Sequence, residues 1–239
     1  MSTTPMLDKG ERGAMADTST SKPLLLLDID GVLNAFPDDA GLRYTRHTID
    51  GYRIHLHHEV RDMVSALAEA FEIVWFTLWN HRASPGIGPH VGLAHAEHLT
   101  TSWERGWEAA AVAGYGDEAI SRLMYAKTPL LPQLMADGRP WVWIDDAHGR
   151  ADADYLVAAG LDPRTFRLVG TDPEVGLMWD DVETALSFAH SLVGGVSGGG
   201  TSSFVGADAD GLHFPGSVVG RVDAVSDEPT DSGDRGASE

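Results

Sequence analysis

The stretch LLLLDIDGVLN, Leu24 to Asn34, places four consecutive leucines directly before an Asp-x-Asp-Gly motif. A short, continuous apolar run is typical of a strand that is buried on both faces of a parallel sheet. Asp28 then stands at the carboxyl end of this strand, and Gly31 permits the chain to turn sharply away from it. Ligands of open α/β sheets bind at the carboxyl ends of the strands, so the stretch predicts a binding site that contains the Asp28 carboxylate. From this motif alone, an aspartate that only caps a turn remains an equal alternative.

A second Asp-x-Asp-Gly occurs at Asp208 to Gly211, but its surroundings differ. The residues before it, GGGTSSFVGA, do not form an apolar run, and no further set of polar strand ends follows it. A short motif indicates a function only in its structural context. We therefore interpret this second copy as part of a polar tail.

The composition is that of an ordinary globular protein, with 43% hydrophobic and 22% charged residues among 239. The chain contains no cysteine, which excludes disulfides, thiolate metal sites and a cysteine nucleophile. The first residues lack the apolar segment of a secretory signal. No apolar run approaches the about 20 residues that a membrane-spanning helix needs, so we expect a cytoplasmic protein without a membrane partner.

The formal net charge is -19, from 17 basic and 36 acidic residues. Such a charge repels the phosphates of nucleic acids and of anionic membranes, which argues against nonspecific binding to either. A local basic pocket remains compatible with a phosphorylated substrate as the partner. The sequence does not give the oligomeric state.

The pattern of polarity divides the chain into three parts. Residues 1–22 are polar and without periodicity, which predicts a disordered leader. Residues 23–193 form the predicted folded domain, of a size usual for one domain. Residues 194–239 are rich in Gly and Ser and hold eight acidic and two basic residues, so we expect a disordered acidic tail.

Within 23–193, segments typical of strands alternate with segments typical of helices. Residues 43–58 contain two stretches around Asp50-Gly51, which predicts a β-hairpin. Apolar residues at helical spacing predict a helix over 59–71. Further strands are expected at 73–77, 141–144 and 165–169, and further helices at 128–135 and 179–192. This alternation predicts an α/β fold, a doubly wound parallel sheet with helices on both faces and a small hairpin flap.

Residues 24–146 resemble the haloacid dehalogenase-like (HAD) phosphohydrolase superfamily, in a form with a small cap or none. The first motif of the family is similar to Asp28-Ile29-Asp30-Gly31, and the second, a hydroxyl residue after the next strand, is similar to Thr77. The third motif, a lysine, is similar to Lys127, and the fourth, an acidic pair, is similar to Asp145-Asp146. All four motifs occur in the order of the family and at the expected places relative to the strands.

A count of lysines supports the third motif. The chain has three lysines, and two of them, Lys9 and Lys22, lie in the predicted leader. Lys127 is therefore the only candidate within the predicted domain. The alternative is a solvated surface lysine, since lysine side chains are normally exposed.

The resemblance implies a mechanism and a cofactor. Asp28 would attack phosphorus to form an aspartyl-phosphate, and Asp30 would act as general acid and then as general base. Thr77 and Lys127 would bind the oxygens of the phosphoryl group. Mg²⁺ would be held by Asp28, by the backbone carbonyl of Asp30 and by one carboxylate of the pair Asp145 and Asp146. The resemblance does not say which member of the pair is the ligand.

The resemblance also favours one activity over others. An acid at the position of Asp30 marks phosphatases and phosphotransferases, because a halide leaves without a proton. We expect a Mg²⁺-dependent phosphomonoester hydrolase. The alternatives are a phosphotransferase, a nucleotide or polynucleotide-end phosphatase, a non-catalytic binding module on the same scaffold, and an acidic tail that itself binds a partner.

The substrate is not given, because specificity in this family depends on caps and loops. The interval between the first two motifs holds only the hairpin and one helix. Residues 81–126 are longer than a simple connection needs, and a short helical insertion over the site is one alternative for 91–110. That alternative would favour a small substrate, whereas an open site would suit a bulky one.

Histidines and tryptophans offer weaker signals. His55, His57 and His58 lie close together in sequence, and His95 and His98 have the spacing of one helix face. None of these spacings is a recognised zinc motif, which favours surface or packing roles. Four tryptophans in or beside predicted strands favour core packing over base stacking: Trp75, Trp79, Trp141 and Trp143.

Overall fold

The computed structural model describes residues 21–39, 41–112 and 127–194. The chain divides into two compact units, Met1–Ser203 and Phe204–Glu239, and all described residues belong to the first. The predictions of a disordered leader over 1–22 and a disordered tail over 194–239 lie outside the described residues, except at Ser21, Lys22 and Gly194. The second Asp-x-Asp-Gly motif lies outside them as well.

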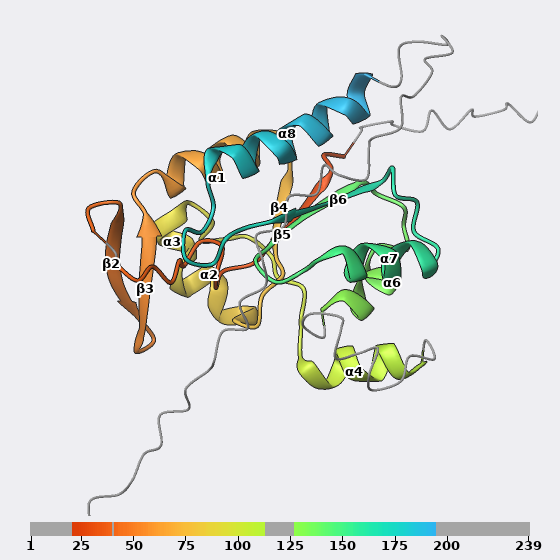
Figure 1. Cartoon of the computed structure of the whole chain (residues 1–239), viewed down its shortest axis with the longest axis horizontal. Helices are drawn as coiled ribbons and strands as arrows, with labels where there is room; N and C mark the ends of the chain where they lie inside the picture. Colours follow the sequence, from red (N-terminus) through yellow and green to blue (C-terminus); the bar gives the residue numbers. More distant parts are fainter. Residues whose placement is uncertain (1–20, 40, 113–126, 195–239) are drawn as a thin grey trace, which may run out of the picture. The chain divides into compact units, whose positions relative to one another are not determined.

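Four parallel strands form the central sheet (Figure 1). Their order is β4–β1–β5–β6, with bounds Leu24–Leu27 for β1, Glu72–Trp75 for β4, Trp141–Asp145 for β5 and Phe166–Gly170 for β6. β1 thus lies between β4 and β5, and Leu27 is in register with Trp75 on one side and Ile144 on the other. This confirms the predicted parallel α/β sheet.

The leucines of β1 explain why both faces of the sheet are covered. Leu25 and Leu27 belong to a core shared with α1 (Val60–Ala70) and α8 (Trp179–Gly194), whereas Leu26 points into a second core. The second core includes residues of α6 (Leu131–Leu134) and α7 (Arg150–Ala158), and Figure 1 shows these helices on the opposite side of the sheet from α1 and α8. All three leucines are completely buried, and each such burial stabilises the fold by roughly 1.5–3 kcal/mol.

The predicted hairpin is confirmed. β2 (Tyr44–Ile49) pairs with β3 (Tyr52–His57) as a separate two-stranded antiparallel sheet. Asp50 and Gly51 form the turn, and both have positive φ, which the twist of a two-residue hairpin turn favours. An antiparallel bridge between Asn34 and Leu56 joins this hairpin to the loop that follows β1.

The segment that follows β4 agrees only in part with the helical insertion considered for 91–110. It contains three short helical turns, η1 (Asn80–Arg82), α2 (Ala83–Gly86) and α3 (Gly88–Val91), and then α4 (Trp103–Val112). The prediction that His95 and His98 lie on one helix is wrong. Gly92 takes a left-handed conformation and ends α3 before these histidines. Residues 97–99 instead run parallel to the outer edge of β4, and the Trp75 N–H donates to the Glu97 carbonyl over 2.8 Å. Residues 113–126 lie outside the described part, so the predicted insertion is described only as far as 112.

The remaining helices lie close to the predicted positions. The predicted helix over 128–135 consists of a 3-10 turn, η2 (Thr128–Leu130), and the single turn of α6. α7 was not predicted, and its sequence has little contrast between an apolar and a polar face. Within the described ranges no helix combines the length and the apolar character that a membrane span requires.

Candidate active site

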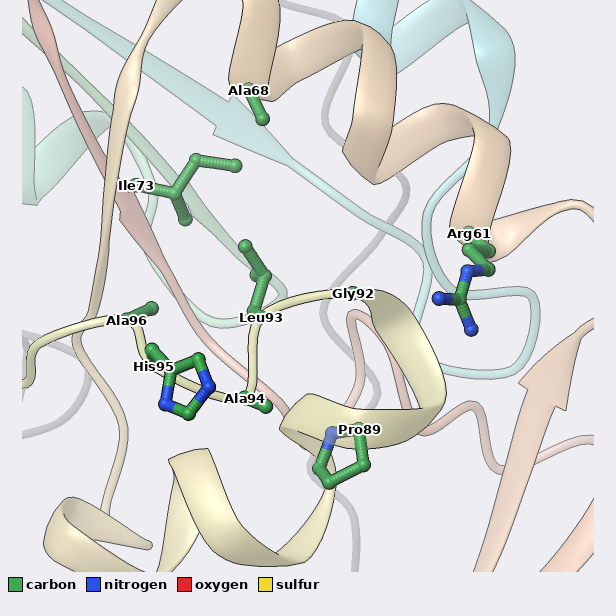
Figure 2. A pocket seen from close by; sticks show the side chains of 9 residues that line it. All are labelled: Arg61, Ala68, Ile73, Pro89, Gly92, Leu93, Ala94, His95 and Ala96. Carbon is green, nitrogen blue, oxygen red and sulfur yellow. The ribbon is translucent and has the colours of Figure 1, made fainter.

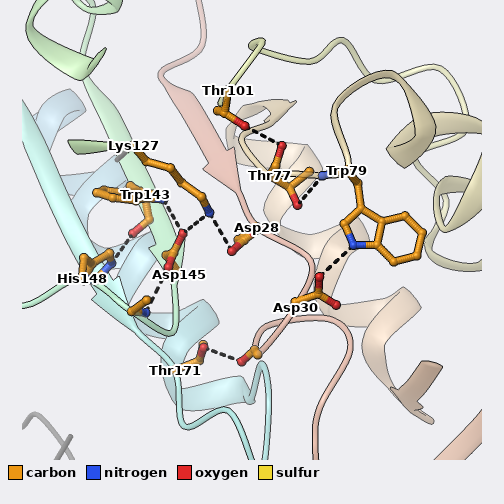
Figure 3. A network of polar contacts seen from close by, with 12 residues as sticks. Asp28, Asp30, Thr77, Trp79, Thr101, Lys127, Trp143, Asp145, His148 and Thr171 are labelled. Atoms are coloured by element: carbon orange, nitrogen blue, oxygen red, sulfur yellow. Dashed lines mark hydrogen bonds and ion pairs between the residues drawn. The ribbon is translucent and has the colours of Figure 1, made fainter. Parts of the chain in front are cut away.

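The central position of β1 brings three of the predicted site residues together. Asp28 follows β1, Thr77 lies two residues after β4, and Asp145 is the last residue of β5. Backbone hydrogen bonds continue past the strands, from Asp28 N–H to the Ile144 carbonyl at 3.1 Å and from Phe76 N–H to the Leu27 carbonyl at 2.9 Å. The carboxyl ends of β4, β1 and β5 therefore meet at one edge of the sheet, where Figure 3 shows the three side chains close together.

Lys127 lies between two carboxylates. Its ammonium nitrogen is 2.7 Å from Asp28 Oδ2 and 2.7 Å from Asp145 Oδ2 (Figure 3). The lysine side chain is only 3% exposed, which rules out a solvated surface lysine. Burial lowers the pKa of Lys127, but the attraction of Asp145 and Asp28 outweighs it and raises that pKa overall. The Lys127 side chain is therefore charged at neutral pH.

A buried hydrogen bond between Thr128 and Asp152 helps to position Lys127. Thr128, the next residue, donates its hydroxyl to Asp152 Oδ1 over 2.5 Å, and Asp152 Oδ2 accepts the N–H of Gly149. Asp152 lies in the first turn of α7, so this carboxylate connects the start of α7 to the start of η2. The unpredicted helix thus fixes the backbone that carries the lysine.

Burial dominates the electrostatics of Asp28. Burial and the nearby Asp145 carboxylate raise the pKa of Asp28, Lys127 and a hydrogen bond from Thr77 lower it, and the net result is a pKa of about 6. One lysine therefore does not fully compensate the burial of this carboxylate. A further cation at the site would favour the ionised form that a nucleophile requires.

The two aspartates of the fourth motif have different surroundings. Asp145 is completely buried and accepts three hydrogen bonds, from Lys127, from the Trp143 indole and from the Ala147 N–H. Asp146 is only partly buried and lies directly over Gly31, where a Cβ atom would approach its Cγ to 2.3 Å. Burial, with Asp145 and Asp28 nearby, raises the pKa of Asp146 to about 7. Gly31 is thus needed both for its positive φ and for the room that Asp146 occupies.

These carboxylates could hold a metal ion. Asp28, Asp145 and Asp146 each offer an oxygen, and the three oxygens lie within 4.8 Å of one another. Three carboxylates against one ammonium leave an excess of negative charge, which the raised pKa values of Asp28 and Asp146 reflect. An all-oxygen set of this kind is suited to a hard divalent cation.

Asp30 is held by two residues that the sequence did not indicate. Asn34 Nδ2 donates to Asp30 Oδ1 and Trp79 Nε1 donates to Asp30 Oδ2, each over 2.8 Å. Asn34 ends the quoted stretch and Trp79 follows Thr77 by two residues, so both lie beside predicted motifs. The burial expected of Trp79 is confirmed, but its indole N–H also faces the predicted general acid.

Residues that follow β6 support the loop that contains Asp30. The Thr171 hydroxyl donates to the Gly31 carbonyl over 2.8 Å, and the Leu177 N–H donates to the Val32 carbonyl over 2.7 Å. On the other side, the Thr101 hydroxyl donates to the Thr77 carbonyl over 2.9 Å. No sequence signal indicated these contacts, because they join residues far apart in the chain.

The loop after β5 contains a buried histidine. His148 Nε2 lies 3.2 Å from the Trp143 carbonyl, and His148 Nδ1 is buried without a hydrogen-bond partner. Burial lowers the pKa of His148, so the ring is neutral at pH 7 and donates from Nε2. The ring packs edge-on to Trp143, whose indole donates to Asp145. His148 thus packs against the tryptophan that binds Asp145 of the acidic cluster.

Two other features lie apart from this cluster. His57, His58 and Glu59 offer ligand atoms within 4.8 Å, but His57 Nδ1 already accepts the Glu59 N–H. A cavity of about 440 Å³ lies between α1, the start of β4 and the chain after α3, and His95 is part of its wall (Figure 2). None of the four predicted motifs lines this cavity, and its lining is mainly apolar.

The model of a protein family described as "HAD domain in Swiss Army Knife RNA repair proteins" matches residues 24–182, more than half of the chain. The chain belongs to this family. The match confirms the resemblance to the HAD superfamily that the four motifs indicated. It includes every residue of the acidic cluster and supports chemistry of the phosphoesterase type. No curated protein matches the chain.

Proposed function

We propose that this protein is a Mg²⁺-dependent phosphomonoester hydrolase that acts through an aspartyl-phosphate. The observation that carries the proposal is the position of Lys127, which contacts both Asp28 and Asp145 at the carboxyl ends of β1 and β5. A buried ammonium there would attract a phosphoryl group to the Asp28 carboxylate, which unlike Asp145 is not already bound by the Trp143 indole and the Ala147 N–H. A structural ion pair alone would not require a partly exposed third carboxylate, Asp146, beside it.

The proposed reaction has two steps. A carboxylate oxygen of Asp28 attacks phosphorus, the bond from phosphorus to the leaving oxygen breaks, and Asp30 gives that oxygen a proton. Asp30 then takes a proton from water, whose oxygen attacks phosphorus and releases phosphate from Asp28. Lys127 and Thr77 bind the oxygens of the transferred group, where negative charge accumulates.

The acidic cluster is the proposed site of Mg²⁺. Asp28 and Asp146 would be carboxylate ligands, because Asp145 already accepts three hydrogen bonds. The ion would neutralise charge on the phosphoryl group during transfer. Of the two carboxylates between which the sequence left the choice open, Asp145 and Asp146, we therefore propose Asp146 as the ligand.

The decisive experiment measures phosphate release from an aryl phosphate and a panel of nucleotides, with Mg²⁺ or with EDTA. We expect release that requires Mg²⁺, and Asp28→Asn should lower it by on the order of 10⁴-fold or more. Asp181→Asn is the matched control, because burial raises the pKa of Asp181 to about 6 as well, outside the acidic cluster. Folded wild-type protein that releases no phosphate from any compound would favour a binding module. Transfer to an added alcohol in preference to water would favour a phosphotransferase.

A specific observation favours the end of a polynucleotide as the substrate. The description of the matching family names RNA repair proteins. In a chain of net charge -19, the hairpin region 43–58 carries three arginines, four histidines and one acidic residue. Arg46 lies on the same hairpin face as Arg53 and His55, since Arg46 pairs with His55 and Thr48 with Arg53. Both arginines are exposed, and neither has an ion pair within the described part of the chain.

This second proposal is tested with an oligonucleotide that carries a terminal phosphate. The double variant Arg46→Gln, Arg53→Gln should lower kcat/KM for the oligonucleotide about 10-fold, and flatten its salt dependence by roughly 1.5 units of log–log slope, because two phosphate contacts are lost. Hydrolysis of a small aryl phosphate should stay unchanged. Arg167→Gln, which removes an exposed arginine of β6 at one edge of the sheet, is the control. Equal losses on both substrates would contradict a role of the hairpin in strand binding.

A further inference from the structure

Two N–H donors from outside the central sheet hold the Asp30 carboxyl group. Asn34 Nδ2 bonds Oδ1 and Trp79 Nε1 bonds Oδ2, each at 2.8 Å (Figure 3). A carboxylate oxygen has two lone pairs, so each oxygen keeps one lone pair for a proton. The two bonds therefore fix the plane of the carboxyl group without preventing proton transfer.

The hairpin fixes the orientation of Asn34. The side chain is buried, and its Oδ1 accepts the N–H of His55 in β3 over 2.9 Å. The His55 carbonyl in turn accepts the N–H of Ala35 over 3.1 Å. Because the amide oxygen is bound to the hairpin, the amide NH₂ group must face Asp30. A flipped amide would lose both hydrogen bonds.

Trp79 is fixed from both its backbone and its ring. Trp79 is 6% exposed, and its ring packs against the Tyr52 ring of the hairpin with the centroids 5.7 Å apart. The Arg82 guanidinium lies 5.6 Å from the centre of the indole. The backbone N–H of Trp79 also donates to Thr77 Oγ1 over 3.4 Å. The indole N–H therefore keeps its direction toward Asp30.

We infer that Asn34 and Trp79 are positioning residues that align Asp30 for both proton transfers of the reaction. In the first transfer, a proton moves from Asp30 to the leaving oxygen as its bond to phosphorus breaks. In the second, a proton of the attacking water moves to Asp30 as the bond from phosphorus to Asp28 breaks. The inference rests on the proposed function, and it adds two residues that no motif of the sequence indicated.

The leaving group provides a readout that a merely structural role would not change. A nitrophenolate leaves as an anion and needs no proton, whereas an alkoxide needs one from the general acid. Misalignment of Asp30 should therefore slow the first step with alkyl phosphates and spare it with aryl phosphates. Substrate binding should not change, because neither residue is assigned a contact with the phosphoryl group.

The test compares the first turnover of two substrates by Trp79→Phe in the full-length chain with Mg²⁺. The substrates are 4-nitrophenyl phosphate and the alkyl phosphate, mononucleotide or oligonucleotide end, that the wild type hydrolyses best. We expect the alkyl rate to fall about 10-fold to 100-fold at unchanged KM, and the aryl rate to fall less than about 3-fold. Trp75→Phe is the matched control, because the buried Trp75 indole donates to Ser84 and not to Asp30.

Asn34→Asp is the second variant. It keeps an acceptor for the His55 N–H but removes the donor to Asp30 and adds a negative charge beside it. We expect the same selective loss with the alkyl substrate. Equal losses with both substrates in either variant, or a selective loss in Trp75→Phe, would reduce Asn34 and Trp79 to structural residues.

A measurement without turnover separates this inference from the proposed function. The chain has seven tryptophans, and the indole N–H signal of Trp79 in a ¹H–¹⁵N spectrum is assigned by its absence in Trp79→Phe. Asp30→Ala should shift this signal and speed its hydrogen exchange, while the Trp75 signal stays in place. An unmoved Trp79 signal would refute the contact itself. A moved signal in a protein without phosphatase activity would keep the contact and reject the proposed function.

Discussion

The two acids of Asp28-Ile29-Asp30 stand two residues apart, yet different regions of the molecule hold them. Asp28 extends a buried strand, and its main partner is charged: Lys127, which also binds Asp145, while Thr77 adds a neutral hydrogen bond. Asp30 lies in the loop beyond the sheet, and its partners are neutral N–H donors from Asn34 and Trp79. One region is built by strand ends, and the other by a loop, a hairpin and an indole.

This difference means that substitutions in the two regions should affect different properties of the protein. Around Asp28 the important quantities are charge and burial, so changes there should alter stability, metal affinity and pH dependence together. Around Asp30 the important quantity is the orientation of the carboxyl group, so changes there should alter proton transfer and little else. Three substitutions around charged groups test the first half of this comparison, and the Trp79→Phe experiment tests the second.

Lys127→Met should have the largest effect on folding. It leaves Asp28 and Asp145 buried side by side without a cation, which we expect to cost about 3–5 kcal/mol in the free energy of unfolding. Phosphate release should fall at least about 100-fold, because the oxygens of the transferred group lose a charged donor. Urea unfolding and phosphate release measure the two losses. Lys22→Met, at an exposed lysine whose ammonium donates to the Ala68 carbonyl, is the control. Unchanged stability of Lys127→Met would mean that the site does not depend on its buried charge balance.

Mg²⁺ should stabilise the protein more at pH 8 than at pH 5. Asp28 and Asp146 have pKa values raised to about 6 and about 7, so without metal their contribution to stability falls as pH rises from about 4 toward those values. Mg²⁺ binds the ionised forms, and at 100 times its dissociation constant it would add roughly 2.7 kcal/mol at pH 8. Below pH 6, protons compete with it. Thermal unfolding with Mg²⁺ or EDTA at both pH values measures this difference.

The matched variant for the metal is Asp146→Asn. It should abolish most of the Mg²⁺-dependent rise in Tm at pH 8, since it removes the most accessible carboxylate of the cluster. The variant should also be more stable than the wild type in EDTA at pH 8, because a group with a raised pKa has been removed. An unchanged response to Mg²⁺ would transfer the role of ligand to Asp145.

The sequence allowed the Asp28 region to be predicted almost completely. Four leucines before Asp28 indicated the strand, and the polar residues after each later apolar run indicated which side chains meet. Parallel strands place their carboxyl ends at one edge, so the topology alone brings Thr77 and Asp145 to Asp28. Lys127 could be singled out because the predicted domain has no other lysine.

The Asp30 region could not be predicted in the same way. The Trp79 indole reaches Asp30 across 49 positions of the chain, and Thr171 reaches Gly31 across 140. Neither contact follows a period of the sequence, and both depend on where loops settle on the finished sheet. The expectation of a helix at His95 and His98 failed for a similar reason, since the free edge of β4 offers backbone partners to that segment.

The smallest effect is expected at Asp181, which shares a raised pKa with Asp28 but is only partly buried and has different surroundings. It lies in the first turn of α8, where its Oδ2 accepts the Met178 N–H, and burial raises its pKa to about 6. With a raised pKa, its contribution to stability falls as pH increases from about 4 to 6, because the folded state binds more protons than the unfolded state. Asp181→Asn removes this fall, so its stability relative to the wild type should increase by about 1 kcal/mol between pH 4.5 and pH 8, after allowance for solvent screening. Phosphate release should stay the same. Urea unfolding at the two pH values would show the change. A loss of activity in Asp181→Asn would mean that a partly buried carboxylate outside the acidic cluster also contributes to the reaction.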